Sequence, residues 1–124
     1  MAENTFYITT PIYYANDEPH IGHSYTTILA DVLSRYHRSM GQEVFFLTGL
    51  DEHGQKVQQV AEERGIDPQK HCDEMAPKWK HLWEKLHIQY DDFIRTTEPR
   101  HEKVVKAVLN AVKDSGVIYM DGPQ

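Results

Sequence analysis

The stretch PIYYANDEPHIGH, residues 11–23, joins an apolar segment to the start of a strongly periodic helix. It is rich in turn-forming residues, and it places two histidines, His20 and His23, close together at the predicted helix start. The preceding residues, 6–10, are aromatic and β-branched, which predicts a short buried strand. A strand that leads through a polar turn into a helix is a frequent setting for the binding of charged ligands.

The rest of the chain alternates between helical and strand patterns. Apolar residues recur with a helical period from Ile21 to Met40, which predicts a helix ended by a glycine. Residues 44–48 form a continuous apolar run, typical of a strand buried on both faces. Residues 92–96 resemble a third strand, and residues 117–120 resemble the start of a fourth. This alternation indicates an α/β fold with a parallel sheet.

Three further helices are predicted after the second strand, over residues 55–64, 68–86 and 99–115. Asp67 is a typical N-cap for the second of them, since a proline follows it at the first helical position. Pro77 falls inside the same helix and should kink or split it. Trp79 and Trp83 lie on its apolar face, where we expect them to pack in the core.

The composition is that of one small domain. The chain has 124 residues and a net charge of −6, which argues against broad electrostatic attraction to nucleic acid. It shows no secretory leader and no apolar run long enough to cross a membrane, so we expect a soluble protein. The single cysteine, Cys72, excludes an internal disulfide and fits a reducing compartment. Five further histidines lie in polar surroundings and are predicted to be surface residues: His37, His71, His81, His87 and His101.

Two polar loops follow the first two strands, at residues 11–23 and 49–54. Because the carboxyl ends of parallel strands meet at one edge of a sheet, we expect these loops to face one site. At the helix start, free amide N–H groups and the helix macrodipole favour an anion, and imidazoles at His20 and His23 could donate hydrogen bonds to phosphate oxygens. Gly22 has no side chain, so a base or ribose could lie against the backbone. These features predict a nucleotide site.

Two other functions remain compatible with these residues. His20, His23, Asp51 and His53 could together hold zinc or iron in a metal-dependent hydrolase, because imidazole and carboxylate groups suit such ions. That alternative leaves the aromatic residues before the histidines unexplained. The chain could also be a non-catalytic module that binds nucleotide weakly.

Residues 20–23 form the His-x-Gly-His pattern of class I aminoacyl-tRNA synthetases. Together with TTPIYYAN at 9–16, FLTGLDEHG at 46–54 and FIRTT at 93–97, the pattern closely resembles the methionyl-tRNA synthetases, and the resemblance covers nearly the whole chain. It implies the first half of a Rossmann-like nucleotide-binding fold, with three parallel strands and flanking helices. Residues 1–124 would then be a single partial catalytic domain that ends near the family's connective insertion, at about 117–124.

The resemblance also implies roles for individual residues. The family's matching histidines contact ATP phosphates and stabilise the transition state, which assigns catalysis to His20 and His23, and adenosine packs against the matching glycine, Gly22. The remaining residues matched to the family's site concern methionine or lie near it: Asp51 for the α-ammonium, Ile12 through its main chain and Tyr14 through its side chain for methionine, and Asn16 and His53 near the site without an assigned role.

The implied substrates are methionine, ATP with Mg²⁺, and tRNA(Met), used in the cytoplasm. The family's zinc site and its Lys-Met-Ser-Lys-Ser-type motif would lie beyond Gln124, so we expect the isolated chain to be weakly active or inactive. Leu50 departs from the family pattern, which usually has Thr beside the aspartate.

Overall fold

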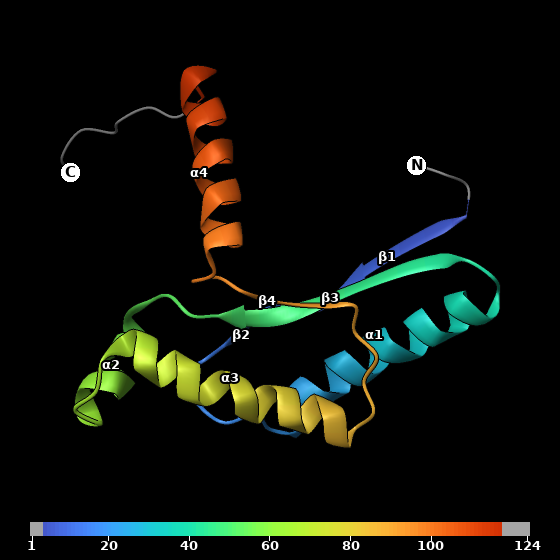
Figure 1. Cartoon of the computed structure of the whole chain (residues 1–124), viewed down its shortest axis with the longest axis horizontal. Helices are drawn as coiled ribbons and strands as arrows, with labels where there is room; N and C mark the ends of the chain where they lie inside the picture. Colours follow the sequence, from blue (N-terminus) through green and yellow to red (C-terminus); the bar gives the residue numbers. More distant parts are fainter. Residues whose placement is uncertain (1–3, 118–124) are drawn as a thin grey trace.

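The computed structural model describes residues 4–117 and has an α/β architecture (Figure 1). Residues 118–120 of the predicted fourth strand lie outside this range. None of the helices in the described part of the chain is long and apolar enough to cross a membrane. The elements follow in the order β1 (Thr5–Thr9), β2 (Tyr13–Tyr14), α1 (Ile21–Ser39), β3 (Glu43–Asp51), α2 (Gln55–Glu63), α3 (Pro68–Lys85), β4 (Asp92–Arg95) and α4 (Pro99–Asp114).

Strand β3 is the centre of a sheet in which every described pairing is parallel. Strands β1 and β2 follow each other along one edge of β3, while β4 pairs with the other edge. Leu50 in β3 is thus in register with Tyr13 of β2 and with Arg95 of β4. The predicted parallel α/β fold is confirmed, and the sequence-based strands at 6–10, 44–48 and 92–96 correspond to β1, β3 and β4.

The carboxyl-terminal part of β3 is longer than the sequence indicates. Residues 49–51, expected in a loop, continue the strand and pair with β2 and β4. A Cβ atom at Gly49 would lie 2.0 Å from the backbone oxygen of Ile94, so only glycine permits this close approach of β4. Leu50 is fully buried in the core, and Asp51 is the last residue of the strand. The predicted short strand was therefore wrong at its carboxyl end.

Helix α3 supplies most of the core that covers the sheet. Its two tryptophans, Trp79 and Trp83, are completely buried, which confirms the core packing expected for them. Trp79 stacks on Tyr13 with the ring centroids 5.1 Å apart, and the same cluster includes Leu50 and Phe93 of the sheet. Helices α1 and α3 lie on the same side of the sheet, while α4 stands away on the other side (Figure 1).

Pro77 does not split α3, which runs without a break from Pro68 to Lys85. Of the kink or split expected at Pro77, the split does not occur. Buried side chains before and after the proline, among them Ala76 and Trp79, hold both parts of the helix against the sheet, and such tertiary packing outweighs the loss of one backbone hydrogen bond.

The apolar stripe that predicts α1 does not face the sheet. The helix itself is confirmed, but the stripe is exposed, with 75% of Tyr25 and 55% of Val32 accessible to solvent. The buried side of α1 instead carries small or hydrogen-bonded residues, because these allow the helix to approach the strands closely: Thr27, Ala30, Asp31 and Ser34. Helix α4 likewise leaves Val104, Val105 and Val108 exposed within the part of the chain that the structure describes.

We predict that Gly49→Ala lowers the free energy of unfolding by about 3 kcal/mol or more, because the added methyl group must push β4 away from β3. Urea unfolding followed by circular dichroism measures the change. Lys103→Ala is the control: this residue is exposed on α4 and has no hydrogen-bond or ion-pair partner among residues 4–117, so its effect should stay within about 0.5 kcal/mol. Equal stability of the two variants would contradict the steric role of Gly49.

Candidate functional site

A hollow of about 270 Å³ opens between the end of β2 and the start of α1. The structure brings most of the predicted site residues together there, with Gly22 in the adjoining first turn of α1. A Cβ atom at Gly22 would lie 3.0 Å from Cε1 of His20, so a side chain there would crowd the imidazole. The lining residues are Ile12, Tyr13, Tyr14, Asn16, Asp17, His20 and His23.

Asp51 lies beside this hollow, on the neighbouring strand. It is in register with Tyr14, and its backbone oxygen accepts a hydrogen bond from the N–H of Ala15 at 3.1 Å. Its carboxylate Oδ1 accepts the N–H of His53 at 3.2 Å, while Oδ2 has no partner within residues 4–117. His53 is exposed and lines a second hollow together with Tyr14. Tyr14 therefore connects the surroundings of the histidines to those of Asp51.

The two histidines are tied to the backbone of the helix start through their Nδ1 atoms. His20 is the N-cap of α1, and its Nδ1 accepts the N–H of Gly22 at 3.1 Å. Nδ1 of His23 accepts the N–H of His20 at 3.2 Å, which completes a reciprocal capping box. Since a backbone N–H can only donate, both Nδ1 atoms lack a proton, and each neutral ring carries its hydrogen on Nε2. The ring centroids are 3.7 Å apart. The pair therefore offers two Nε2–H donors side by side.

Most of the backbone amides at the start of α1, which were expected to be free for an anion, are already hydrogen-bonded. The N–H groups of Gly22, His23 and Ser24 all bond to atoms of His20 and are occupied within the turn. No acidic residue lies in the first turn of α1, so the positive end of its macrodipole is not neutralised there. An anion at this helix start would meet the imidazole donors, together with the backbone N–H of Ile21, which has no hydrogen-bond partner within residues 4–117.

Burial, followed by the charge of the neighbouring His20, lowers the pKa of His23. Its ring lies 4.8 Å from that of Trp79 and 4.9 Å from that of Tyr13, both measured between centroids. The Tyr13 hydroxyl hydrogen-bonds to Oγ1 of Thr27 at 2.9 Å and thereby links β2 to α1. Sequence reasoning missed this supporting role because it placed Tyr13 in a turn.

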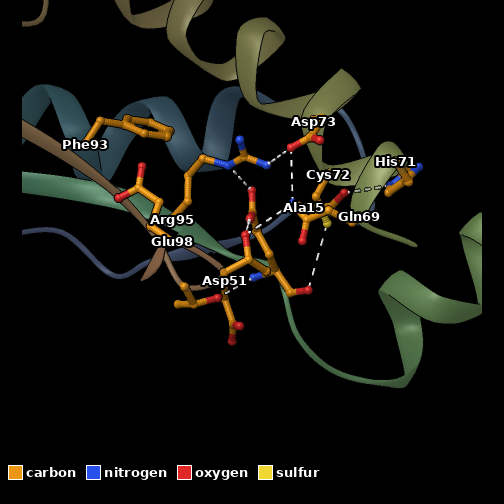
Figure 2. A network of polar contacts seen from close by, with 12 residues as sticks. Ala15, Asp51, Gln69, His71, Cys72, Asp73, Phe93, Arg95 and Glu98 are labelled. Atoms are coloured by element: carbon orange, nitrogen blue, oxygen red, sulfur yellow. Dashed lines mark hydrogen bonds and ion pairs between the residues drawn. The ribbon is translucent and has the colours of Figure 1, made fainter. Parts of the chain in front are cut away.

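A polar network under Asp51 was also missed. Glu52 follows Asp51, and its buried carboxylate accepts the Nε–H of Arg95 at 2.6 Å. Figure 2 shows Arg95 extending toward Asp73 of α3, which its Nη2 atom contacts at 2.5 Å, so this guanidinium joins the two carboxylates. Burial and then the charge of Glu52 raise the pKa of the Cys72 thiol to about 11, so the thiol stays protonated at neutral pH. The sequence did offer one signal for this contact: Glu52 and Arg95 carry opposite charges, and both stand at or shortly after the carboxyl ends of predicted strands.

His71 is not a surface residue, contrary to the prediction. It is only 2% exposed, and its Nε2 donates to the backbone oxygen of Ala15 at 2.8 Å. Its Nδ1 accepts from Arg64 at 2.7 Å, which fixes the ring in the tautomer with a hydrogen on Nε2. The side chain thus anchors the segment between Tyr14 and Asn16 to α3.

The residues of the metal-hydrolase alternative do not form a shared set of ligands. Within residues 4–117, no three His, Cys, Asp or Glu side chains lie close enough together to hold one metal ion. Both site histidines use Nδ1 for backbone hydrogen bonds.

A parallel sheet with a His-Ile-Gly-His helix start at its carboxyl edge is the arrangement of the class I synthetase catalytic fold. Residues 6–123 match the family described as tRNA synthetases class I (M), and the chain belongs to this family. The methionine–tRNA ligase of Thermotoga maritima is 59% identical over 114 residues, which are 92% of this chain and 18% of that protein. The corresponding ligase of Streptococcus pneumoniae is 58% identical over 120 residues, 97% of this chain and 18% of that protein.

The fold agrees with solved structures of the same family. The chain superimposes on Mycobacterium tuberculosis methionyl-tRNA synthetase bound by methionyl-adenylate with a TM-score of 0.92 and 38% identity. That likeness covers 94% of this chain and 23% of the mycobacterial chain. The chain thus spans about a fifth of the length of these relatives. The Rossmann-like class predicted from the sequence is confirmed.

We predict that nitrogen NMR at neutral pH finds both site histidines with bare Nδ1 and protonated Nε2 atoms. His23 should titrate below the ordinary value of 6.5, because burial and the charge of His20 both disfavour its imidazolium. His20→Gln removes the like charge and should move the pKa of His23 upward. A proton on Nδ1 of His23 at neutral pH would contradict the capping geometry.

Proposed function

We propose that the protein carrying this segment activates methionine with ATP to form methionyl-adenylate, and then transfers the methionyl group to tRNA(Met). The segment would supply the first half of the active site. The observation that carries the proposal is the pair of Nε2–H donors at the start of α1, in a hollow shared with Tyr14 and adjacent to Asp51. Relatives that share this segment are named methionine–tRNA ligases, and one is solved with methionyl-adenylate.

The proposed role of His20 and His23 concerns the phosphates of ATP. A carboxylate oxygen of methionine attacks the α-phosphorus, a new P–O bond forms, and the bond to the bridging oxygen breaks as pyrophosphate leaves with the electron pair. Negative charge on the phosphate oxygens shifts during this step, and Nε2–H donors held in place beforehand stabilise it without reorganisation. Adenosine would pack against Gly22. Mg²⁺ would arrive with ATP and partly neutralise its phosphates.

Asp51 is the proposed partner of the methionine α-ammonium. Its Oδ2 atom is uncommitted within residues 4–117, and a carboxylate facing a cationic amine forms a strong, charge-assisted hydrogen bond. Tyr14 and the main chain of Ile12 would line the rest of the amino-acid site, and both residues border the hollow. Asn16 borders it as well, and His53 lies next to Asp51; we assign no role to either.

The second step would transfer the methionyl group to the terminal adenosine of tRNA(Met), in the cytoplasm. The net charge of −6 agrees with tRNA contacts that lie mainly outside these 124 residues. The family's zinc site and further phosphate-binding lysine would also lie outside them. The isolated segment should consequently be weakly active or inactive.

The test is methionine-dependent ATP–pyrophosphate exchange by the full-length protein. We expect strong exchange with methionine, and a loss of about 10²–10³-fold in the activation rate for His20→Ala or His23→Ala, since each removes one transition-state donor. The KM for ATP should change much less than the rate. Equal losses in rate and in ATP affinity would refute a transition-state role, and no exchange with methionine would refute the proposed function.

Asp51→Ala should raise the KM for methionine about tenfold or more, because the α-ammonium loses its charged hydrogen-bond partner. The KM for ATP is the internal reference and should remain close to that of the parent protein. Asp114→Ala, at the exposed end of α4, controls for the loss of a carboxylate elsewhere. An unchanged methionine KM in Asp51→Ala would rule out the ammonium contact.

A further inference from the structure

The peptide unit between Asp51 and Glu52 is hydrogen-bonded at both of its polar atoms. Its oxygen, which belongs to Asp51, accepts the N–H of Ala15 at 3.1 Å on the β2 side. Its N–H, which belongs to Glu52, donates to Oγ1 of Thr96 at 2.9 Å on the β4 side. Strand β4 ends at Arg95, before this position. The hydrogen bond to the Glu52 N–H is therefore made by the side chain of Thr96 and not by a backbone oxygen of the strand.

The side chain of Glu52 adds two further bonds to the same strand end. One oxygen accepts the Nε–H of Arg95 at 2.6 Å, and the other accepts the hydroxyl of Thr97. Arg95 also contacts Asp73 of α3, and this bond lowers the pKa of Asp73 (Figure 2). The carboxylate of Glu52 is completely inaccessible to solvent, so it cannot touch a ligand in the hollow.

These bonds determine where the Asp51 carboxylate lies. A planar peptide that is held on both sides fixes the backbone torsion that follows Cα of Asp51, and with it the direction of the Cα–Cβ bond. The carboxylate itself has only one described partner, the N–H of His53 at 3.2 Å, in an exposed turn two residues away. Its position relative to Tyr14 therefore depends on the backbone rather than on side-chain contacts of its own.

We propose that Thr96 and Glu52 are positioning residues, which hold the Asp51–Glu52 peptide so that the Asp51 carboxylate meets the α-ammonium of the amino-acid substrate. The proposal rests on the function proposed above for Asp51. Neither side chain contacts the substrate. Thr96 acts on the peptide directly, and Glu52 acts by joining it to Arg95 and Thr97.

A stability role alone would not explain the choice of groups. A buried ion pair adds little net stability over apolar side chains of the same size, because its charges lose their hydration. Four polar contacts, from Arg95, Thr96, Thr97 and Ala15, nevertheless converge on one peptide and the side chain beside it. Such contacts fix the backbone geometry of Asp51, the residue before Glu52.

The test compares Thr96→Val with Thr96→Ser in the full-length protein, by methionine-dependent ATP–pyrophosphate exchange. Valine keeps the shape of threonine but removes the acceptor for the Glu52 N–H, so we expect the KM for methionine to rise about tenfold, since small misplacements of a positioned group are costly. Serine retains the hydroxyl and should restore most of the affinity. The KM for ATP should change less than twofold, by about the error of the assay, in both variants.

Thr9→Val is the matched control. It makes the same chemical change at the end of β1, and the Thr9 hydroxyl has no hydrogen-bond partner among the described residues. It should leave the KM for methionine unchanged. Thermal unfolding of each variant shows whether it is folded at the assay temperature.

A double-mutant cycle with Asp51→Asn separates positioning from a general structural effect. If Thr96 acts through Asp51, Thr96→Val should have no further effect on the methionine KM once Asp51→Asn is present. Independent, multiplicative losses in the double variant would overturn the inference. Should Thr96→Val fail to fold, Glu52→Gln replaces it in the same cycle, and a normal methionine KM for that variant would also overturn it.

The cycle distinguishes this inference from the proposed function. An unchanged methionine KM in Asp51→Asn alone would refute the role of Asp51 itself. A raised KM in Asp51→Asn, together with a normal KM in Thr96→Val, would refute only the positioning role.

Discussion

The close contact between β3 and β4 at Gly49 is the constraint on which the site depends. Without a side chain at this position, β4 pairs with β3 as far as Leu50, and β2 pairs with the opposite edge of β3 at the same level. Asp51 and Tyr14 consequently emerge next to each other. One residue that contributes no atoms to the hollow thus sets the distance between the strand that carries Asp51 and the polar residues at and just beyond the end of β4 that support it.

The fold was largely predictable because its signals are local. The helical period from Ile21 to Met40, and the N-cap and proline at Asp67 and Pro68, are read within a few residues of sequence, and the structure confirms α1 and the start of α3. Sequence reasoning also predicted that the candidate site residues lie close together, because loops at the carboxyl ends of parallel strands meet at one edge of the sheet. The same rule placed Asp51 near them without any knowledge of distances.

What could not be predicted depends on contacts between distant residues. Nothing near His71 in the sequence reveals that its ring will reach Ala15, and the acidic pair at Asp51 and Glu52 gives no sign that its two members face different partners. The period of α1 shows an amphipathic helix, but it cannot say that Asp31 will be buried. That residue faces the interior because the N–H of Gln89 and the guanidinium of Arg35 satisfy its carboxylate.

At the start of α1, one side chain, that of His20, both caps the helix and belongs to the proposed phosphate site. Histidine is not among the residues favoured at an N-cap, where serine, threonine, asparagine and aspartate stabilise helices best. An aspartate in place of His20 would suit the macrodipole and strengthen the helix, yet it would set a negative charge against the proposed phosphate site. A more stable helix and the proposed phosphate site therefore place opposite demands on this position, and a search for stabilising substitutions in this segment should leave it untouched.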